Sequence, residues 1–542
     1  MIGNWIKSKY TILFGILILA AGLKIWLITS GKIPFDSDEA VVGLMARHIQ
    51  AGERPIFFYG QAYMGSLDAF LVAAGFALFG QQVWVIRLVQ TILYLGTITV
   101  TFFVAEKGFQ SVKAGLVAAL LMAIPAVNTT LYTTASLGGY GEAILIGSLI
   151  LLVALEILND PGDRARGNQS SKLSLFSGLF GFLSGMGLWA FGLSLIFTAS
   201  AGITIFLDAI RHRKKLSWIP MVFSGLAGFL LGSAPWWSYA VQHGFSNLVL
   251  ELSGSAVAVE SGSLIDKLLA HGINFFLLGL PALWGLRPPW EVRWLTVPLI
   301  PFVLAIWVAL IYWGIRTLIR SRNPLLSMAW GVIFLQAAAF LLTPFGIDPS
   351  GRYFLPLVIS FALTAGYLME ALPAHTSVKW GAIAVLVAFQ LGGNVESALR
   401  FPPGITTQFG PETRVDHTAD GELVRFLQEN GETTGYTNYW VSYPMAFLSS
   451  EKIIFVPDLP YHLDLRYTPR DDRYQPYAQI VQDSPRVALI TTGQPALEKF
   501  IREYLREAGI HWSERKIGDY LVFYHLTQKP EIVRLTLKVS PP

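Results

Sequence analysis

Residues 10–40 read YTILFGILILAAGLKIWLITSGKIPFDSDEA, an apolar run that ends in a short acidic loop. A helix that crosses a bilayer needs about 20 mostly apolar residues, and residues 11–30 provide them. Lys7 and Lys9 precede the run, and no small-residue cleavage site follows a short apolar core. The segment is therefore predicted to be a retained signal anchor and the first membrane span.

The composition of the whole chain agrees with a membrane protein. Of the 542 residues, 53% are hydrophobic and 14% are charged, and the mean hydropathy is +0.50. Soluble domains carry about 25% charged residues. The absence of cysteine excludes structural disulfides and thiolate zinc sites. A net charge of +4 is too small to indicate nucleic acid as a partner, and the chain has no Walker loop or Rossmann fingerprint.

The apolar stretches predict an all-α polytopic protein with about eleven transmembrane helices. Two shorter or interrupted stretches, 64–80 and 264–285, are expected to be interfacial or re-entrant helices on the outer side. The eleven expected spans are 10–30, 83–105, 112–130, 142–158, 174–190, 192–210, 217–238, 295–317, 324–343, 353–372 and 378–396.

Basic residues predict how these spans are oriented. Lys and Arg are enriched in short cytoplasmic loops, and here they cluster on alternate predicted loops. We therefore expect a multi-pass protein of the plasma or inner membrane, with the N-terminus in the cytoplasm and the C-terminus outside. The clusters are Lys107 and Lys113; Arg164, Arg166 and Lys172; Arg211, Arg213, Lys214 and Lys215; and Arg316, Arg320 and Arg322.

The composition changes near residue 400, where Pro402, Pro403 and Gly404 follow the last span and charged residues become frequent. We predict a transmembrane module over 1–398, with a first outer loop at 31–82, and a small extracytoplasmic α/β domain over 399–542. Its aromatic residues near 436–443 offer a carbohydrate platform or, by default, a packed helix face. Its expected elements are helices at 419–430 and 494–507 and strands at 452–456, 486–491 and 519–525.

The first outer loop carries three acids, Asp36, Asp38 and Glu39, ahead of apolar residues at helical spacing. One interpretation is helix capping, because Asp36 and Glu39 are spaced as in a capping box. The other is chemical. A cap needs only one carboxylate, and charge at the membrane interface is costly unless it is used. Asp38 would then act as a base toward a hydroxyl or as a ligand of a divalent metal.

The acidic pair Asp38-Glu39, the Gly52–Pro55 stretch, Leu78-Phe79-Gly80 and Arg87 together resemble the C-type glycosyltransferases. These have the GT-C fold, and the families most similar to this chain are the protein O-mannosyltransferases and the lipid A aminoarabinose transferases. The resemblance covers roughly residues 10–160 and, more weakly, 320–370. It implies that Asp38 is the catalytic residue, with Glu39 beside it.

Two later segments fit the same resemblance. Residues 132–142 (YTTASLGGYGE) place Glu142 where related enzymes carry a second acid, although a glycine-rich turn before a helix explains them equally. Residues 343–356 (TPFGIDPSGRYFLP) contain Arg352 and Tyr353. These are either an interfacial Arg and Tyr pair or, as in the similar transferases, a phosphate-binding site, because guanidinium matches phosphate oxygens.

Four further side chains are candidate sugar-binding groups of the first loop: His48, Tyr59, Gln61 and Tyr63. A solvated helix face or an interfacial tyrosine belt explains them as well.

The resemblance implies a sugar donor on a polyprenyl phosphate and an acceptor that is a glycan, a lipid or a protein. Asp38 would activate the acceptor hydroxyl and transfer would invert the anomeric carbon. Any divalent metal would be held by Asp38 and Glu142. The alternatives from other classes are a secondary transporter and a non-catalytic membrane sensor or scaffold. The acids at the outer edge rather than the midplane favour the transferase.

Overall fold

The computed structural model describes residues 2–159, 169–211, 218–250, 262–400, 404–408, 410 and 413–530. Contacts within the chain group these residues into two compact units. Unit 1 comprises Met1–Ser30, Tyr63–Asp68 and Arg87–Leu399. Unit 2 comprises Gly31–Ala62, Ala69–Ile86 and the described part of Arg400–Pro542. Most of the first outer loop therefore packs with the C-terminal segment.

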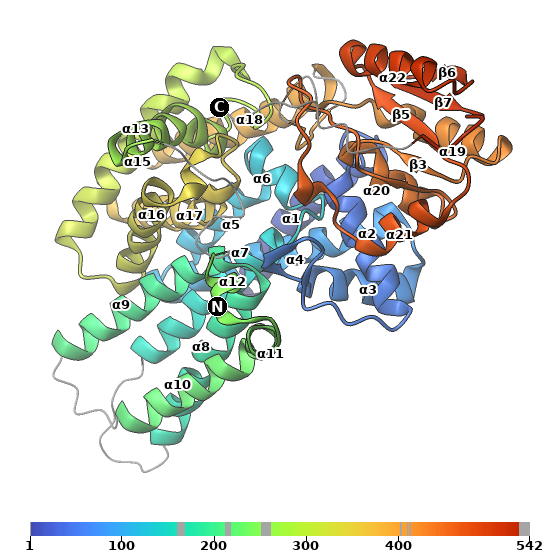
Figure 1. Ribbon diagram of the computed structural model, residues 1–542. Helices are drawn as coiled ribbons and strands as arrows, with labels where there is room; N and C mark the ends of the chain where they lie inside the picture. Colours follow the sequence, from blue (N-terminus) through green and yellow to red (C-terminus); the bar gives the residue numbers. More distant parts are fainter. Residues whose placement is uncertain are drawn as a thin grey trace. The chain divides into compact units, whose positions relative to one another are not determined.

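The chain is a multi-pass membrane protein. Among the described residues, ten helices are long and apolar enough to cross a membrane, and an eleventh candidate is a pair bent by 64°, Ile219–Gly232 and Ala234–His243. The ten are Ser8–Thr29, Val83–Phe109, Tyr140–Leu158, Lys172–Ala190, Gly192–Arg211, Leu264–Leu283, Val297–Arg320, Pro324–Leu342, Arg352–Ala371 and Thr376–Arg400. In Figure 1 they belong to α1 (Ile2–Thr29), α4 (Val83–Phe109), α7 (Tyr140–Leu158), α8 (Gln169–Ala190), α9 (Leu195–Arg211), α13 (Leu264–Ile273), α14 (Leu280–Leu283), α15 (Ile300–Arg320), α16 (Pro324–Leu342), α17 (Leu355–Ala371) and α18 (Thr376–Arg400).

Two of the sequence predictions about spans were wrong in detail. The predicted single span at 112–130 is two short helices, α5 (Val112–Ala123) and α6 (Val127–Tyr132), because Pro125 lacks an amide hydrogen and disfavours helix at the preceding residue. Conversely, 264–285 contains a run from Leu264 to Leu283 that is long enough to span, since a π-helical turn at Asn274–Gly279 joins α13 to α14. The 64–80 stretch forms only α3 (Leu67–Phe79) and is short, as predicted.

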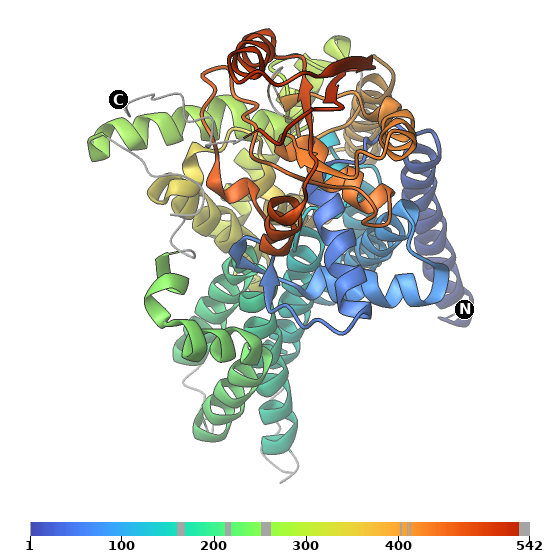
Figure 2. The ribbon, with the colours of Figure 1, turned by 45° about the vertical axis from the view of Figure 1, so that its right-hand side comes forward.

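Helices α8 and α10 (Trp218–Gly232) of unit 1 lie side by side in Figures 1 and 2. Glycines on both helices allow this approach. A Cβ added to Gly185 would lie 2.1 Å from the carbonyl oxygen of Phe229, and one added to Gly228 would lie 2.1 Å from that of Gly178. Small residues of this kind permit close helix packing inside a membrane, where apolar burial gives little driving force.

The C-terminal part of unit 2 is an α/β structure with a five-stranded sheet, ordered β4-β3-β5-β7-β6. Strands β4 and β5 are each parallel to β3, and β7 pairs antiparallel with both β5 and β6. Leu497, Ile501 and Leu505 of α22 pack against Leu489 and Phe523 of the sheet. The strands are β3 (Thr434–Tyr436), β4 (Ile454–Val456), β5 (Ala488–Thr492), β6 (Ser513–Ile517) and β7 (Tyr520–Tyr524), and the helices are α19 (Asp420–Glu429), α20 (Tyr439–Leu448), α21 (Gln475–Asp483) and α22 (Pro495–Glu507).

All five predicted elements of this part exist, whereas β3, β6, α20 and α21 were not predicted. Helix α2 (Ser37–Gln50) of the first outer loop packs closely on α20, since a Cβ on Gly43 would lie 2.6 Å from the ring of Phe447. A two-stranded hairpin, β1 (Phe57–Phe58) and β2 (Gln61–Gly65), follows α2.

Candidate functional site

Asp36 is the N-cap of α2, the helix predicted in the first outer loop. Its Oδ1 accepts a hydrogen bond from the Glu39 amide at 3.1 Å, and its Oδ2 accepts one from Thr407 Oγ1 at 2.6 Å. The capping interpretation is therefore confirmed for this residue. Burial, together with the neighbouring charge of Asp38, raises the pKa of Asp36 to about 7.

Asp38 is the partly exposed member of the three acids, because Asp36 and Glu39 are both buried. The phenol of Tyr439 donates a hydrogen bond to Asp38 Oδ1 at 2.5 Å. Ser37 Oγ donates to the backbone carbonyl of the same tyrosine at 2.5 Å. The C-terminal part of unit 2 thus holds the residues that open α2 in place, and among the three acids the Asp38 side chain is the one that solvent reaches.

Two of the predicted sugar-binding residues of the first loop are packed among partners of unit 2. His48 Nδ1 lies 3.0 Å from Tyr59 Oη, and its Nε2 lies 2.9 Å from Glu451 Oε1. The ring of Tyr59 stacks on Tyr474 with a centroid separation of 4.8 Å. Gln61 begins β2 and is half-buried. The contacts of His48 and Tyr59 are those of a polar core that joins α2 to α21 and its preceding loop.

Glu142 lies in the first turn of α7 in unit 1 and is buried together with a second acid, Asp68. The amide nitrogen of Gln90 donates to Asp68 Oδ1 at 2.9 Å and to Glu142 Oε1 at 3.2 Å. Ser136 Oγ donates to the other oxygen of Asp68 at 2.5 Å. Burial raises the pKa of Asp68. Glu142 is therefore part of a buried polar cluster and not only a turn residue.

Arg352 of unit 1 stands before α17 and forms an ion pair with Asp348, with 2.7 Å between Nη2 and Oδ2. Asp348 Oδ1 also accepts hydrogen bonds from the amide and hydroxyl of Ser350, which hold the tight turn. Within the described parts of the chain, the buried Nε of Arg352 has no hydrogen-bond acceptor. The guanidinium, 5.0 Å from the ring centroid of Tyr353, therefore retains donor capacity for an anion.

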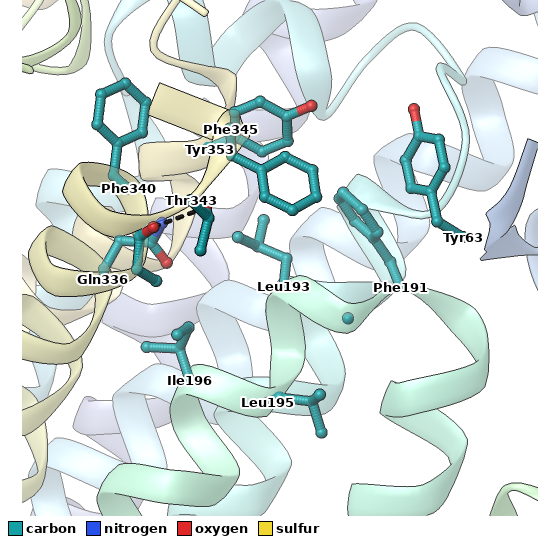
Figure 3. Close-up of a pocket in the computed structure, with 12 residues that line it drawn as sticks. Tyr63, Phe191, Leu193, Leu195, Ile196, Gln336, Phe340, Thr343, Phe345 and Tyr353 are labelled. Carbon is teal, nitrogen blue, oxygen red and sulfur yellow. Dashed lines mark hydrogen bonds between the residues drawn. The ribbon is translucent and has the colours of Figure 1, made fainter. Parts of the chain in front are cut away.

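Tyr353, which this arginine contacts, is one of the residues that line an apolar cavity of about 190 Å³ in unit 1. Figure 3 shows Tyr353 and Phe345 above Leu193, with Phe191 and Tyr63 on another side. The predicted site residues Tyr63 and Tyr353 thus line the same cavity, together with aliphatic side chains. The lining is Tyr63, Phe191, Gly192, Leu193, Leu195, Ile196, Gln336, Ala339, Phe340, Thr343, Phe345 and Tyr353.

A scan of protein-family models and a search of curated proteins found no match to this sequence. Among solved structures, ArnT from Cupriavidus metallidurans bound to undecaprenyl phosphate is similar with a TM-score of 0.59 and 12% identity, over 96% of this chain and 98% of that one. The same protein in the apo state gives 0.56 and 14% identity, over 94% and 98%. The apo oligosaccharyltransferase from Archaeoglobus fulgidus gives 0.56 and 11% identity, over 89% of this chain and 69% of that one.

The chain has the GT-C fold. The resemblance inferred from the first outer loop is thereby confirmed at the level of fold.

The sequence did not single out two residues that the structure places beside the candidate acids, Asp68 and Tyr439. Asp68 had a usable signal, since an acid inside an apolar stretch is by default a functional-site hypothesis. Tyr439 had none, because its hydrogen bond to Asp38 joins residues 401 positions apart. No group of three or more His, Asp or Glu side chains that could hold a metal ion occurs among the described residues, and a metal held by Asp38 and Glu142 stays a prediction.

Proposed function

We propose that this chain is a glycosyltransferase that moves a sugar from a polyprenyl-phosphate donor to a hydroxyl outside the cytoplasm, with inversion at the anomeric carbon. The acceptor is a glycan, a lipid or a protein. The GT-C fold supports the class of reaction, and one of the solved proteins with this fold was crystallised with undecaprenyl phosphate.

The observation that carries the proposal is that the Arg352 guanidinium lies 5.0 Å from the ring centroid of Tyr353, a residue that lines the apolar cavity. A partly exposed guanidinium whose buried Nε is an unused donor favours an anion, and phosphate oxygens match its planar geometry. The adjoining cavity, lined by Tyr353, Phe345 and Leu193, favours a hydrocarbon. A ligand with an anionic head and an apolar tail satisfies both, and a polyprenyl phosphate has that form.

Each step then has a residue. The acceptor oxygen attacks the anomeric carbon while the bond from that carbon to the phosphate oxygen breaks, and the lipid phosphate leaves with both bonding electrons. Asp38 takes the proton of the hydroxyl as a general base. Arg352 stabilises the charge that grows on the departing phosphate. Glu142, hydrogen-bonded through Gln90 to Asp68, is the second acid of the proposed site.

The experiment is the substitution Asp38→Asn, with Asp464→Asn as control. Asp464 is an acid of the same unit whose side chain is 57% exposed. Membranes that contain each variant receive polyprenyl phosphates carrying different radiolabelled sugars, and label transfer is measured. Loss of a general base lowers the rate by about 100-fold or more. Full transfer by Asp38→Asn would remove Asp38 from the mechanism, and no transfer from any such donor by the unmodified protein would reject the function.

A further inference from the structure

The hydroxyl of Tyr439 is held in a fixed place by the surrounding residues of unit 2. Tyr439 is only 3% exposed, and its ring contacts the rings of Trp440 and Tyr443 at centroid separations of 5.2 and 5.6 Å. The guanidinium carbon of Arg473 lies 5.2 Å from the ring centroid on the same tyrosine. A side chain packed on several sides loses its rotamer freedom, so its hydroxyl is an anchored donor.

The start of α20 is equally constrained. Asn438 is its N-cap and accepts a hydrogen bond from the Trp440 amide at 3.0 Å, while its own amide donates to Thr492 Oγ1 of β5 at 2.7 Å. The sheet therefore sets where α20 begins, and α20 sets where the Tyr439 phenol lies.

The electrostatics keep this phenol a donor. Burial and the adjacent carboxylate of Asp38 raise the pKa of Tyr439 well above its usual range. Asp38 Oδ2, by contrast, makes no hydrogen bond to any described residue. One carboxylate oxygen is thus occupied by a fixed donor, and the other remains for a hydroxyl.

We propose that Tyr439 is a positioning residue for the reaction, which holds the Asp38 carboxylate so that Oδ2 faces the acceptor hydroxyl. The inference rests on the proposed function, in which Asp38 is the general base. It assigns to the C-terminal part of the chain a role in orienting that base. Tyr439 itself does not exchange a proton. Its hydrogen bond fixes the carboxylate and stabilises its charged form, as the groups that orient catalytic bases do.

The magnitude follows from the geometry. Loss of the phenol frees a partly exposed carboxylate to rotate, and a misplacement of about 1 Å of a catalytic group costs up to about 100-fold in rate. We expect Tyr439→Phe to lower kcat by about 10- to 100-fold and to leave the KM for the lipid-linked donor unchanged.

The matched control is Tyr520→Phe. Tyr520 is a buried tyrosine of the same unit whose phenol also donates to a carboxylate, that of Asp420. Both substitutions remove one buried phenol–carboxylate hydrogen bond and keep the ring, so similar losses of thermal stability are expected. Only Tyr439→Phe is expected to change kcat.

The double variant Asp38→Asn/Tyr439→Phe completes the test in the donor-transfer assay. If Tyr439 acts through Asp38, removing its phenol from the Asp38→Asn protein lowers the residual rate no further. A further loss of the same size as in the native background would assign Tyr439 a purely structural role. If the unmodified protein transfers sugar from no polyprenyl-phosphate donor, the proposed function fails, and if Asp38→Asn alone retains full transfer, Asp38 is not the base and this inference fails with it. If Asp38→Asn is inactive and Tyr439→Phe is normal, only this inference fails.

Discussion

Replacement of Arg352 tests the phosphate site most directly. In the structure one Nη of this arginine bonds Asp348 at 2.7 Å, and its Nε has no acceptor among the described residues. A hydrogen bond to a charged group contributes about 1.5–3 kcal/mol. Because about 1.4 kcal/mol is tenfold in affinity, Arg352→Gln should raise the KM for a polyprenyl-phosphate sugar by about 10- to 150-fold. Arg352→Lys keeps the charge and loses the planar fork, so its effect should be smaller, about tenfold.

The fold should survive these changes. Asp348 keeps two hydrogen bonds from Ser350 when the arginine is lost, so no buried acid is left without a donor. The control is Arg293→Gln, since Arg293 is an arginine of unit 1 whose side chain is 58% exposed beside Glu291. It should leave the donor KM as it is in the native protein.

Donor kinetics and competition by undecaprenyl phosphate provide the readout. We expect the KM for the donor and the inhibition constant of undecaprenyl phosphate to rise in the order native protein, Arg352→Lys, Arg352→Gln. The thermal midpoints of the three proteins should be similar. If both Arg352 variants bind the competitor as tightly as the native protein does, the guanidinium is an interfacial anchor and the phosphate site lies elsewhere.

Two other predictions concern stability. Gly185→Ala would place a Cβ 2.1 Å from the Phe229 carbonyl oxygen, where a carbon–oxygen contact needs about 3.3 Å, so α8 and α10 must separate by about 1 Å. We expect Gly185→Ala to lower the free energy of unfolding by about 1–3 kcal/mol and to lower the thermal midpoint. The control Gly202→Ala should show no loss, because a Cβ at Gly202 would have nothing within 4 Å. Equal thermal midpoints for the two variants would refute the close packing of α8 and α10. The pKa of Asp36 is raised to about 7 in the folded protein, against about 3.9 in the unfolded chain. The folded state therefore binds the Asp36 proton more tightly than the unfolded state does. The contribution of Asp36 to stability falls as the pH rises from about 4 to 7. Asp36→Asn should therefore flatten the dependence of the unfolding midpoint on pH over that range, and an unchanged profile would contradict this.

The local signals in the sequence were sufficient for the first outer loop. A cap residue, apolar residues at helical spacing and a closing glycine are all short-range features, and α2 begins and ends near where they place it. The same holds for α19 and α22, whose apolar residues recur on one face. The tertiary partners of Asp36 and Asp38 are hundreds of residues away, so no local pattern could identify Thr407 or Tyr439.

The missed elements of unit 2 break local rules. Strand β3 has three residues, too few for an alternating pattern, and β6 exposes most of its length. Helix α20 contains Pro444 and a run of aromatic residues, which local propensity does not favour as helix. The default interpretation of its aromatic face is confirmed, because Tyr439, Trp440 and Tyr443 are all buried.

The error at 112–130 has a physical consequence for the membrane part. At 1.5 Å per residue, α5 rises about 18 Å, so it ends before a full crossing. Beyond Pro125 the segment carries buried threonines, and irregular backbone at membrane depth is tolerated only where protein partners satisfy it. Lys24, inside the first apolar run, supplies those partners: its ammonium donates to the Thr133 carbonyl at 2.6 Å and to the Thr134 hydroxyl at 2.8 Å. Lys24 lowers the hydropathy of the first span, and its ammonium is the hydrogen-bond donor for the threonines that follow α6.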